Sequence, residues 1–184
     1  MKNTKRDNVK KLTVTEFMLA LGLVLPFLTG QIQSIGSMLL PMHLPVFLCA
    51  LICGWEFGVP MAFILPLLRS FMFGMPPMYP TALAMAFELA TYALVAGLLY
   101  KKSKQSILSL YVAMIAAMVA GRAVWGVCMM ILLGVKGNTF TLSAFLSGAL
   151  LNAIPGIILQ LILIPVIMVA LKKAKLIPIE GSKA

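Results

Sequence analysis

Long apolar runs, broken by short polar or proline-rich segments, occupy almost the whole of this chain of 184 residues. A helix needs about 20 mostly apolar residues to cross the hydrocarbon core of a bilayer. By this criterion the pattern predicts six membrane-spanning helices, at residues 14–28, 43–55, 57–73, 80–100, 107–133 and 142–171. We therefore expect an all-α integral membrane protein, in which six transmembrane helices form one bundle and one membrane domain over residues 1–184.

Basic residues gather in three segments that flank the predicted spans. Residues 1–11 hold five Lys or Arg, residues 101–104 hold three, and residues 172–183 hold four. A six-span path brings all three segments to one side of the membrane and leaves only Lys136 on the opposite side. Because cytoplasmic loops are enriched in Lys and Arg, we expect both termini in the cytoplasm. No small-x-small cleavage site follows the first apolar run, which predicts a retained span rather than a signal peptide.

The overall charge and the motifs exclude several functions. The formal net charge is +10, but the basic residues border apolar segments instead of forming the polar basic face of a nucleic-acid binder. The sequence has no P-loop for ATP phosphates, no G-x-S-x-G and no H-E-x-x-H. Its single histidine and its three cysteines in apolar runs, Cys49, Cys53 and Cys128, predict neither a metal site nor a cofactor.

Three charged residues interrupt the predicted spans: Arg69, Glu88 and Arg122. An ionisable side chain at the centre of a membrane helix costs about 3 kcal/mol or more. Such residues usually face a bundle interior or a wet cavity, and they often mark a substrate path. Helical rise puts Glu88 about 12 Å below the outer edge and Arg122 about 22 Å above the inner one. Arg69 lies near the outer end of its span.

Two further polar residues fall at a similar level. His43 opens the second predicted span from the outer side, and Asn152 lies about 15 Å below the outer end of the sixth. We therefore expect Glu88, Arg122, Asn152, Arg69 and His43 to line a substrate site in the outer half of the membrane. Alternatives remain for single residues. For Glu88 and Arg122, the alternative is a purely structural ion pair. For Arg69, it is a side chain that snorkels to the interface, and for His43 it is a polar residue that only marks a helix end.

Small residues in the first span indicate a close helix contact. Ala20 and Gly22 allow another helix to approach, so we expect this surface to be either an internal contact or a docking site for another membrane protein. Gln160 lies deeper than the other polar residues, and we expect it to form an interhelical hydrogen bond.

Four short motifs resemble one branch of a known family. They are M-H-L-P-V at 42–46, P-L-L-R-S at 66–70, F-G-M-P-P-M-Y-P-T at 73–81 and A-F-E-L-A-T-Y at 86–92. Together with the chain length, the six predicted spans and the basic ends, this block resembles the substrate-binding S component of an energy-coupling factor (ECF) vitamin transporter.

The resemblance implies a division of labour. An S component binds a small water-soluble vitamin from outside and docks on a transmembrane coupling subunit that carries two cytoplasmic ATPases. The expected partners are thus the vitamin, these subunits and membrane lipid, and ATP hydrolysis lies on the partner chains. The family often shows an A-x-x-x-A pattern in the first span for docking. Here Ala20 is followed four residues later by Val24, so Ala20 and Gly22 are expected to take the place of that pattern.

The vitamin stays open at this stage. Two arginines favour an anion such as pantothenate, since guanidinium binds carboxylate through two parallel hydrogen bonds. Glu88 favours instead a donor-rich ring, such as a pyridine or pyrimidine vitamin. Neither inference holds if Glu88 and Arg122 pair only with each other. Two other function classes remain: an intramembrane enzyme with Glu88 and His43 as acid and base, or a carrier that transports without partners.

Overall fold

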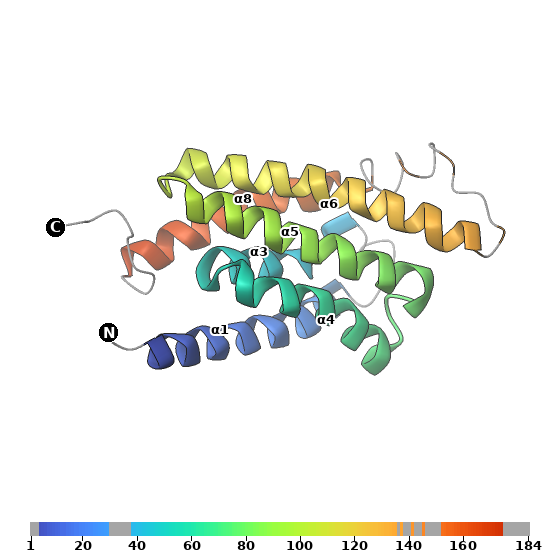
Figure 1. Ribbon diagram of the computed structural model, residues 1–184, viewed down its shortest axis with the longest axis horizontal. Helices are drawn as coiled ribbons and strands as arrows, with labels where there is room; N and C mark the ends of the chain where they lie inside the picture. Colours follow the sequence, from blue (N-terminus) through green and yellow to red (C-terminus); the bar gives the residue numbers. More distant parts are fainter. Residues whose placement is uncertain are drawn as a thin grey trace.

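The computed structural model describes residues 4–29, 38–135, 137, 141, 145 and 152–174. Within these ranges all regular secondary structure is helical. The elements in chain order are α1 Thr4–Val24, the 3-10 helix η1 Leu25–Thr29, α3 His43–Cys53, α4 Trp55–Phe73, the short η2 Met78–Ala82, α5 Leu83–Lys102, α6 Ile107–Val135 and α8 Ile154–Lys173. The long helices lie side by side as a bundle (Figure 1). This arrangement agrees with the all-α bundle that the apolar pattern predicts.

Five of the described helices are long and apolar enough to cross a membrane. These candidate spans are Lys5–Leu28, Trp55–Phe73, Met78–Lys102, Ile107–Val135 and Ile154–Lys173. The helix at the predicted second span is short: α3 has 11 residues and ends two residues before the predicted end at residue 55. Its rise of about 16 Å covers only about half of a hydrocarbon core. The described part of the chain thus has five candidate spans and one half-length helix, and the count of six full spans is not confirmed.

Two observed helix starts differ from the predicted ones by ten residues or more. α1 begins at Thr4, ten residues before the predicted start, because the basic segment is itself rich in good helix formers. The last predicted span starts at residue 142, but residues 142–144 and 146–151 lie outside the described part. The described helix α8 begins at Ile154, behind a turn at Asn152 and Ala153. Pro155 fits this start, because the first turn of a helix has no use for the N–H that proline lacks.

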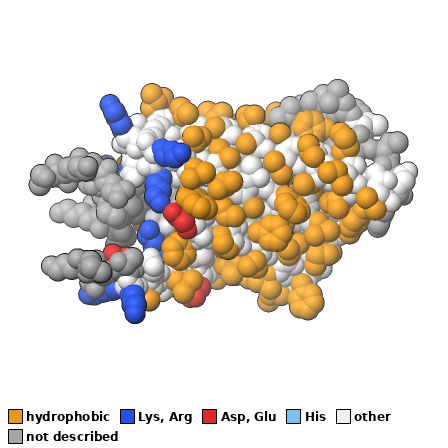
Figure 2. Space-filling model, viewed as in Figure 1, with side chains coloured by type: hydrophobic (Ala, Val, Ile, Leu, Met, Phe, Trp, Pro, Cys, Tyr) orange, Lys and Arg blue, Asp and Glu red, His pale blue; other side chains and the backbone are white. Residues whose placement is uncertain are grey.

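The bundle has one basic end. The start of α1, the connection between α5 and α6 and the end of α8 lie at the left of Figure 1. The Lys and Arg side chains of the visible face gather at the same end in Figure 2, and apolar side chains predominate over the middle of that face. Here Lys101 Nζ lies 2.7 Å from Glu56 Oε1, and Lys172 Nζ donates to the backbone carbonyl of Gln105 at 2.8 Å. That this basic end is cytoplasmic stays a prediction.

α3 lies at the centre of the bundle, where it contacts α1, α4, α5 and α8. It passes into α4 at Gly54, whose φ of 96° is a conformation that other residues rarely adopt. One turn into α4, Gly58 lets the two helices touch, since a Cβ there would lie 2.9 Å from the Cα of Ala50. This tight hairpin fixes the position of the short α3, and with it the depth of His43, its first residue.

Candidate functional site

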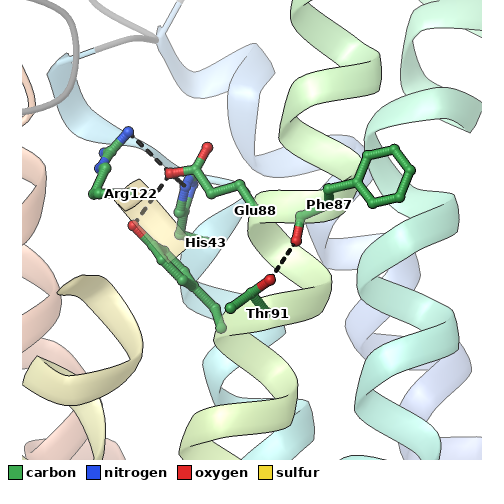
Figure 3. A network of polar contacts seen from close by, with 6 residues as sticks. His43, Phe87, Glu88, Thr91 and Arg122 are labelled. Atoms are coloured by element: carbon green, nitrogen blue, oxygen red, sulfur yellow. Dashed lines mark hydrogen bonds and ion pairs between the residues drawn. The ribbon is translucent and has the colours of Figure 1, made fainter. Parts of the chain in front are cut away.

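Glu88 of α5 and Arg122 of α6 face each other inside the bundle (Figure 3). Arg122 Nη1 lies 2.9 Å from Glu88 Oε1, and only 10% of the Arg122 side chain and 1% of the Glu88 side chain are exposed. The hairpin of α5 and α6 sets this register. Glu88 lies 14 residues before the end of α5, and Arg122 lies 15 residues after the start of α6. Both residues therefore lie about 22 Å from the basic end.

Two further side chains complete a cluster around Glu88. Tyr92, one turn along α5, donates a hydrogen bond from its hydroxyl to Glu88 Oε1 at 3.2 Å. His43 brings Nε2 to 3.7 Å from the same oxygen, which is too long for a hydrogen bond. The Tyr92 ring lies against the rings of both His43 and Phe47, with centroids 5.2 Å apart in each pair. We call Glu88, Arg122, His43 and Tyr92 the Glu88 cluster.

Gly121 makes room for this cluster. A Cβ at this position would lie 2.0 Å from Cε1 of Tyr92 and 3.1 Å from the backbone oxygen of Glu88. The Tyr92 ring thus packs directly on the backbone of α6, beside the residue that precedes Arg122 in the sequence. A side chain at position 121 would displace the ring whose hydroxyl donates to Glu88.

Four buried nitrogens of the Glu88 cluster have no hydrogen-bond partner within the described part of the chain. They are Nδ1 and Nε2 of His43 and Nε and Nη2 of Arg122. A buried polar group left unpaired costs about 1–3 kcal/mol, and most such groups in folded proteins are paired. The cluster therefore has spare hydrogen-bonding groups within the described part of the chain.

Arg69 belongs to a different contact. Its guanidinium donates to the backbone carbonyl of Leu23, and it lies 5.0 Å from the ring centroid of Phe27 and 5.3 Å from that of Phe73. Leu23 is close to the end of α1, where Pro26 has no N–H to offer to that carbonyl in a 3-10 turn. Arg69 therefore joins the ends of α1 and α4. Its described contacts include no member of the cluster.

The structure places Asn152 outside the helix that was predicted to hold it. Asn152 lies in the turn before α8, and it is exposed. Gln160 lies further along α8 and is 1% exposed, and its amide nitrogen has no hydrogen-bond partner among the described residues. An interhelical hydrogen bond from that nitrogen is thus not observed in this part of the chain.

Ala20 and Gly22 lie on different faces of α1. Gly22 is buried against α4, since a Cβ there would lie 2.6 Å from Cδ2 of Leu65. Ala20 is exposed, as are Phe17 and Val24, which precede and follow it by three and four residues. Gly22 is therefore an internal contact. Of these two small residues, only Ala20 is accessible to a partner.

Sequence reasoning missed Tyr92, although the motif at 86–92 contains it. A signal was present in the spacing. Tyr92 follows Glu88 by four residues, and residues four apart on a helix are neighbours on one face. A buried tyrosine also needs a partner for its hydroxyl, and the carboxylate one turn away supplies it.

The fold and the cluster together define a class of protein. Apolar helices long enough to span a membrane enclose a polar cluster that has spare hydrogen-bonding groups. In the ranges that the structure describes, no three His, Cys, Asp or Glu side chains come together as metal ligands. These features describe a multi-pass membrane protein with a candidate binding site in its interior.

The comparison with protein families identifies the family of this chain. The family model described as "ECF transporter, substrate-specific component" matches residues 10–168, and the chain belongs to this family. No curated protein and no solved structure matches the chain. The resemblance carried by the sequence motifs is therefore confirmed.

Family membership establishes the general role of the chain. It is a substrate-binding subunit of an ECF transporter and a multi-pass protein of the cell membrane. Subunits of this kind are not enzymes. The interpretation of Glu88 and His43 as the acid and base of an intramembrane enzyme is therefore not supported.

Proposed function

We propose that this chain binds a small water-soluble vitamin from outside the cell at the Glu88 cluster and delivers it through an ECF transport complex. Family membership supports a substrate-binding role. The choice of the Glu88 cluster as the binding site rests on one observation. Four buried nitrogens of His43 and Arg122 lack a partner among the described residues. Because an unpaired buried donor is costly, a ligand that accepts hydrogen bonds from these groups is stabilised at this position.

The depth of His43 supports access from the end opposite the basic one. α3 begins at His43 and runs only 11 residues toward the basic end, so His43 lies about 16 Å from the far end of its own helix. The described residues just before it pack on α8, because a Cβ on Gly156 of α8 would be 2.6 Å from the carbonyl oxygen of Met38. A ligand that enters from the end at which α3 begins reaches the cluster from the non-basic side. This side is the outside if the basic end is cytoplasmic.

For delivery, we propose that the chain docks on a transmembrane coupling subunit that carries two cytoplasmic ATPases. The chain has no P-loop of its own, and family membership implies partners of this kind. α1 packs against α3 and α4, and its residues Phe17, Ala20 and Val24 are exposed. Their spacing of three and four residues puts them on one face, where a partner helix has access to the small side chain of Ala20.

The chemical identity of the vitamin is the finer part of the proposal. Pantothenate and a pyridine or pyrimidine vitamin are the candidates that the polar residues suggest. The decisive experiment is mass spectrometry of the small molecules released from the purified, folded protein. We expect one vitamin at close to one molecule per chain.

Variants of the cluster assign the bound vitamin to this site. Glu88→Gln and Arg122→Met are expected to lose the vitamin, because each removes one partner of a buried charged contact. Thr91→Val is a matched control on α5, since the Thr91 hydroxyl donates to the carbonyl of Phe87 outside the cluster (Figure 3). Normal binding by both cluster variants would place the site elsewhere. Release of no vitamin, together with no binding across a panel of water-soluble vitamins, would exclude the proposed function.

A further inference from the structure

The Arg122 guanidinium contacts Glu88 through only one of its three nitrogens, Nη1. Nη1 lies 2.9 Å from Glu88 Oε1, while Nε and Nη2 are buried and have no partner among the described residues. Nε and Nη2 form one edge of the planar group, with two N–H bonds that match the two oxygens of a carboxylate. The edge left over is thus the edge that suits a carboxylate.

His43 contributes the other two buried nitrogens of the cluster that lack a partner among the described residues. Neither His43 nitrogen has a partner in the part of the chain that the structure describes, and an imidazole always carries at least one N–H donor. Glu88 Oε1 already receives contacts from both Arg122 and Tyr92. A ligand that complements the unpaired N–H groups of Arg122 and His43 supplies hydrogen-bond acceptors to them.

We propose that the ligand is an acidic vitamin whose carboxylate binds the Nε–Nη2 edge of Arg122. This inference rests on the proposed vitamin-binding function and narrows it, because it favours acids such as pantothenate over rings that mainly donate hydrogen bonds. Glu88 then acts as a positioning residue. Its contact with Nη1 fixes the plane of the guanidinium and turns the other edge toward the ligand.

The first test compares acids with their uncharged analogues on the full-length protein in lipid nanodiscs. The probes are pantothenate against panthenol, in which an alcohol replaces the carboxylate, and nicotinate against nicotinamide. We expect one acid to bind at least about tenfold more tightly than its analogue, which corresponds to about 1.4 kcal/mol. A vitamin that binds equally well in its neutral form overturns the carboxylate inference and leaves the vitamin-binding function intact.

Variants of Arg122 assign the preference to its edge. Arg122→Lys keeps a charge beside Glu88 but cannot span two oxygens. We expect it to weaken binding of the acid about tenfold and so to reduce the difference in affinity between the acid and its neutral analogue. Because Arg122→Met alone leaves Glu88 buried without its counter-charge, the second variant is the neutral pair Glu88→Gln/Arg122→Met. This pair is expected to bind acid and analogue equally, and a preference for the acid that survives both variants overturns the inference.

Released molecules decide the matter if none of the four probes binds. The small molecule carried by the purified protein is then identified by mass spectrometry, and it is expected to contain a carboxylate. A bound vitamin without an acidic group overturns the carboxylate inference alone. A protein that carries nothing and binds no vitamin of the panel overturns the proposed function, and the inference with it.

Discussion

Arg69 donates a hydrogen bond to the backbone carbonyl of Leu23 and so ties the end of α4 to the point where α1 passes into η1. Its guanidinium also lies near the rings of Phe27 and Phe73, which meet edge to face with centroids 4.9 Å apart. A cation over an aromatic face is stabilised further where water is excluded. These contacts give Arg69 a structural role that does not depend on a ligand.

We expect Arg69→Met to destabilise the fold without removing ligand binding. The loss of a hydrogen bond from a charged group costs about 1.5–3 kcal/mol, and the lost cation–π contacts add to this. Thermal unfolding of the purified protein measures the destabilisation. The rise in melting temperature on adding vitamin reports binding in the same experiment. Loss of that rise in a folded Arg69→Met protein would instead place Arg69 in the substrate site, as the sequence alone suggests.

The pairing of Glu88 with Arg122 is predictable from sequence because α5 and α6 form a hairpin. Only residues 103–106 separate the two helices, so counting helical rise from this connection sets both side chains at the same height. Two opposite charges in an apolar environment then favour each other. The free edge of Arg122 is not predictable in this way, because it depends on which guanidinium nitrogen faces the carboxylate.

Arg69 and Asn152 show why other parts of the site were not predictable. The partner of Arg69 is the backbone carbonyl of Leu23. Pro26 marks this carbonyl as one without an N–H donor three residues later, but the sequence does not show which side chain reaches it. For Asn152, the apolar run continues through residues 142–171, although the described helix begins at Ile154. The available signal was Pro155, since proline favours the first turn of a helix.

Gly121→Ala tests whether the close packing of Tyr92 on α6 supports the cluster. The added Cβ would lie 2.0 Å from the Tyr92 ring, and overpacking of this kind costs about 1–3 kcal/mol. We expect lower thermal stability and weaker vitamin binding, since the ring that donates to Glu88 must move. Gly134→Ala on the same helix is the control, because a Cβ there meets nothing within 4 Å and Ala is favoured over Gly in a helix. Equal behaviour of the two variants would mean that Tyr92 moves aside at little cost.

Single-cysteine labelling tests the orientation of the bundle. In a chain whose three cysteines are replaced by alanine, Ser103→Cys lies in the connection between α5 and α6 at the basic end. We expect it to react with a membrane-impermeant maleimide only after permeabilisation, because Lys-rich connections stay in the cytoplasm. Val135→Cys, at the opposite end of α6 and 80% exposed, is expected to react in intact cells. The reverse pattern would invert the topology, and Ser182→Cys, outside the described residues, gives an independent reading of the C-terminal segment.

The docking proposal predicts separate effects on uptake and on binding. Ala20→Trp adds a bulky group to the exposed face of α1 that carries Phe17 and Val24. Uptake by cells that express the coupling subunit and ATPases is expected to fall about tenfold or more, because small residues set how closely membrane helices approach. Vitamin affinity of the purified protein is expected to stay the same, since the Glu88 cluster lies on α3, α5 and α6.

Two matched variants separate docking from folding. Val119→Trp enlarges a residue of α6 that is 68% exposed, and we expect uptake and binding to stay unchanged. Gly22→Leu enlarges the buried face of α1, where Leu65 leaves no room for a Cβ, and it is expected to lower the yield of folded protein and both activities together. A Val119→Trp protein with the same uptake defect as Ala20→Trp would show that any bulky surface residue interferes with transport. Equal loss of binding and uptake in Ala20→Trp would show that the exposed face of α1 supports the fold itself and not a partner.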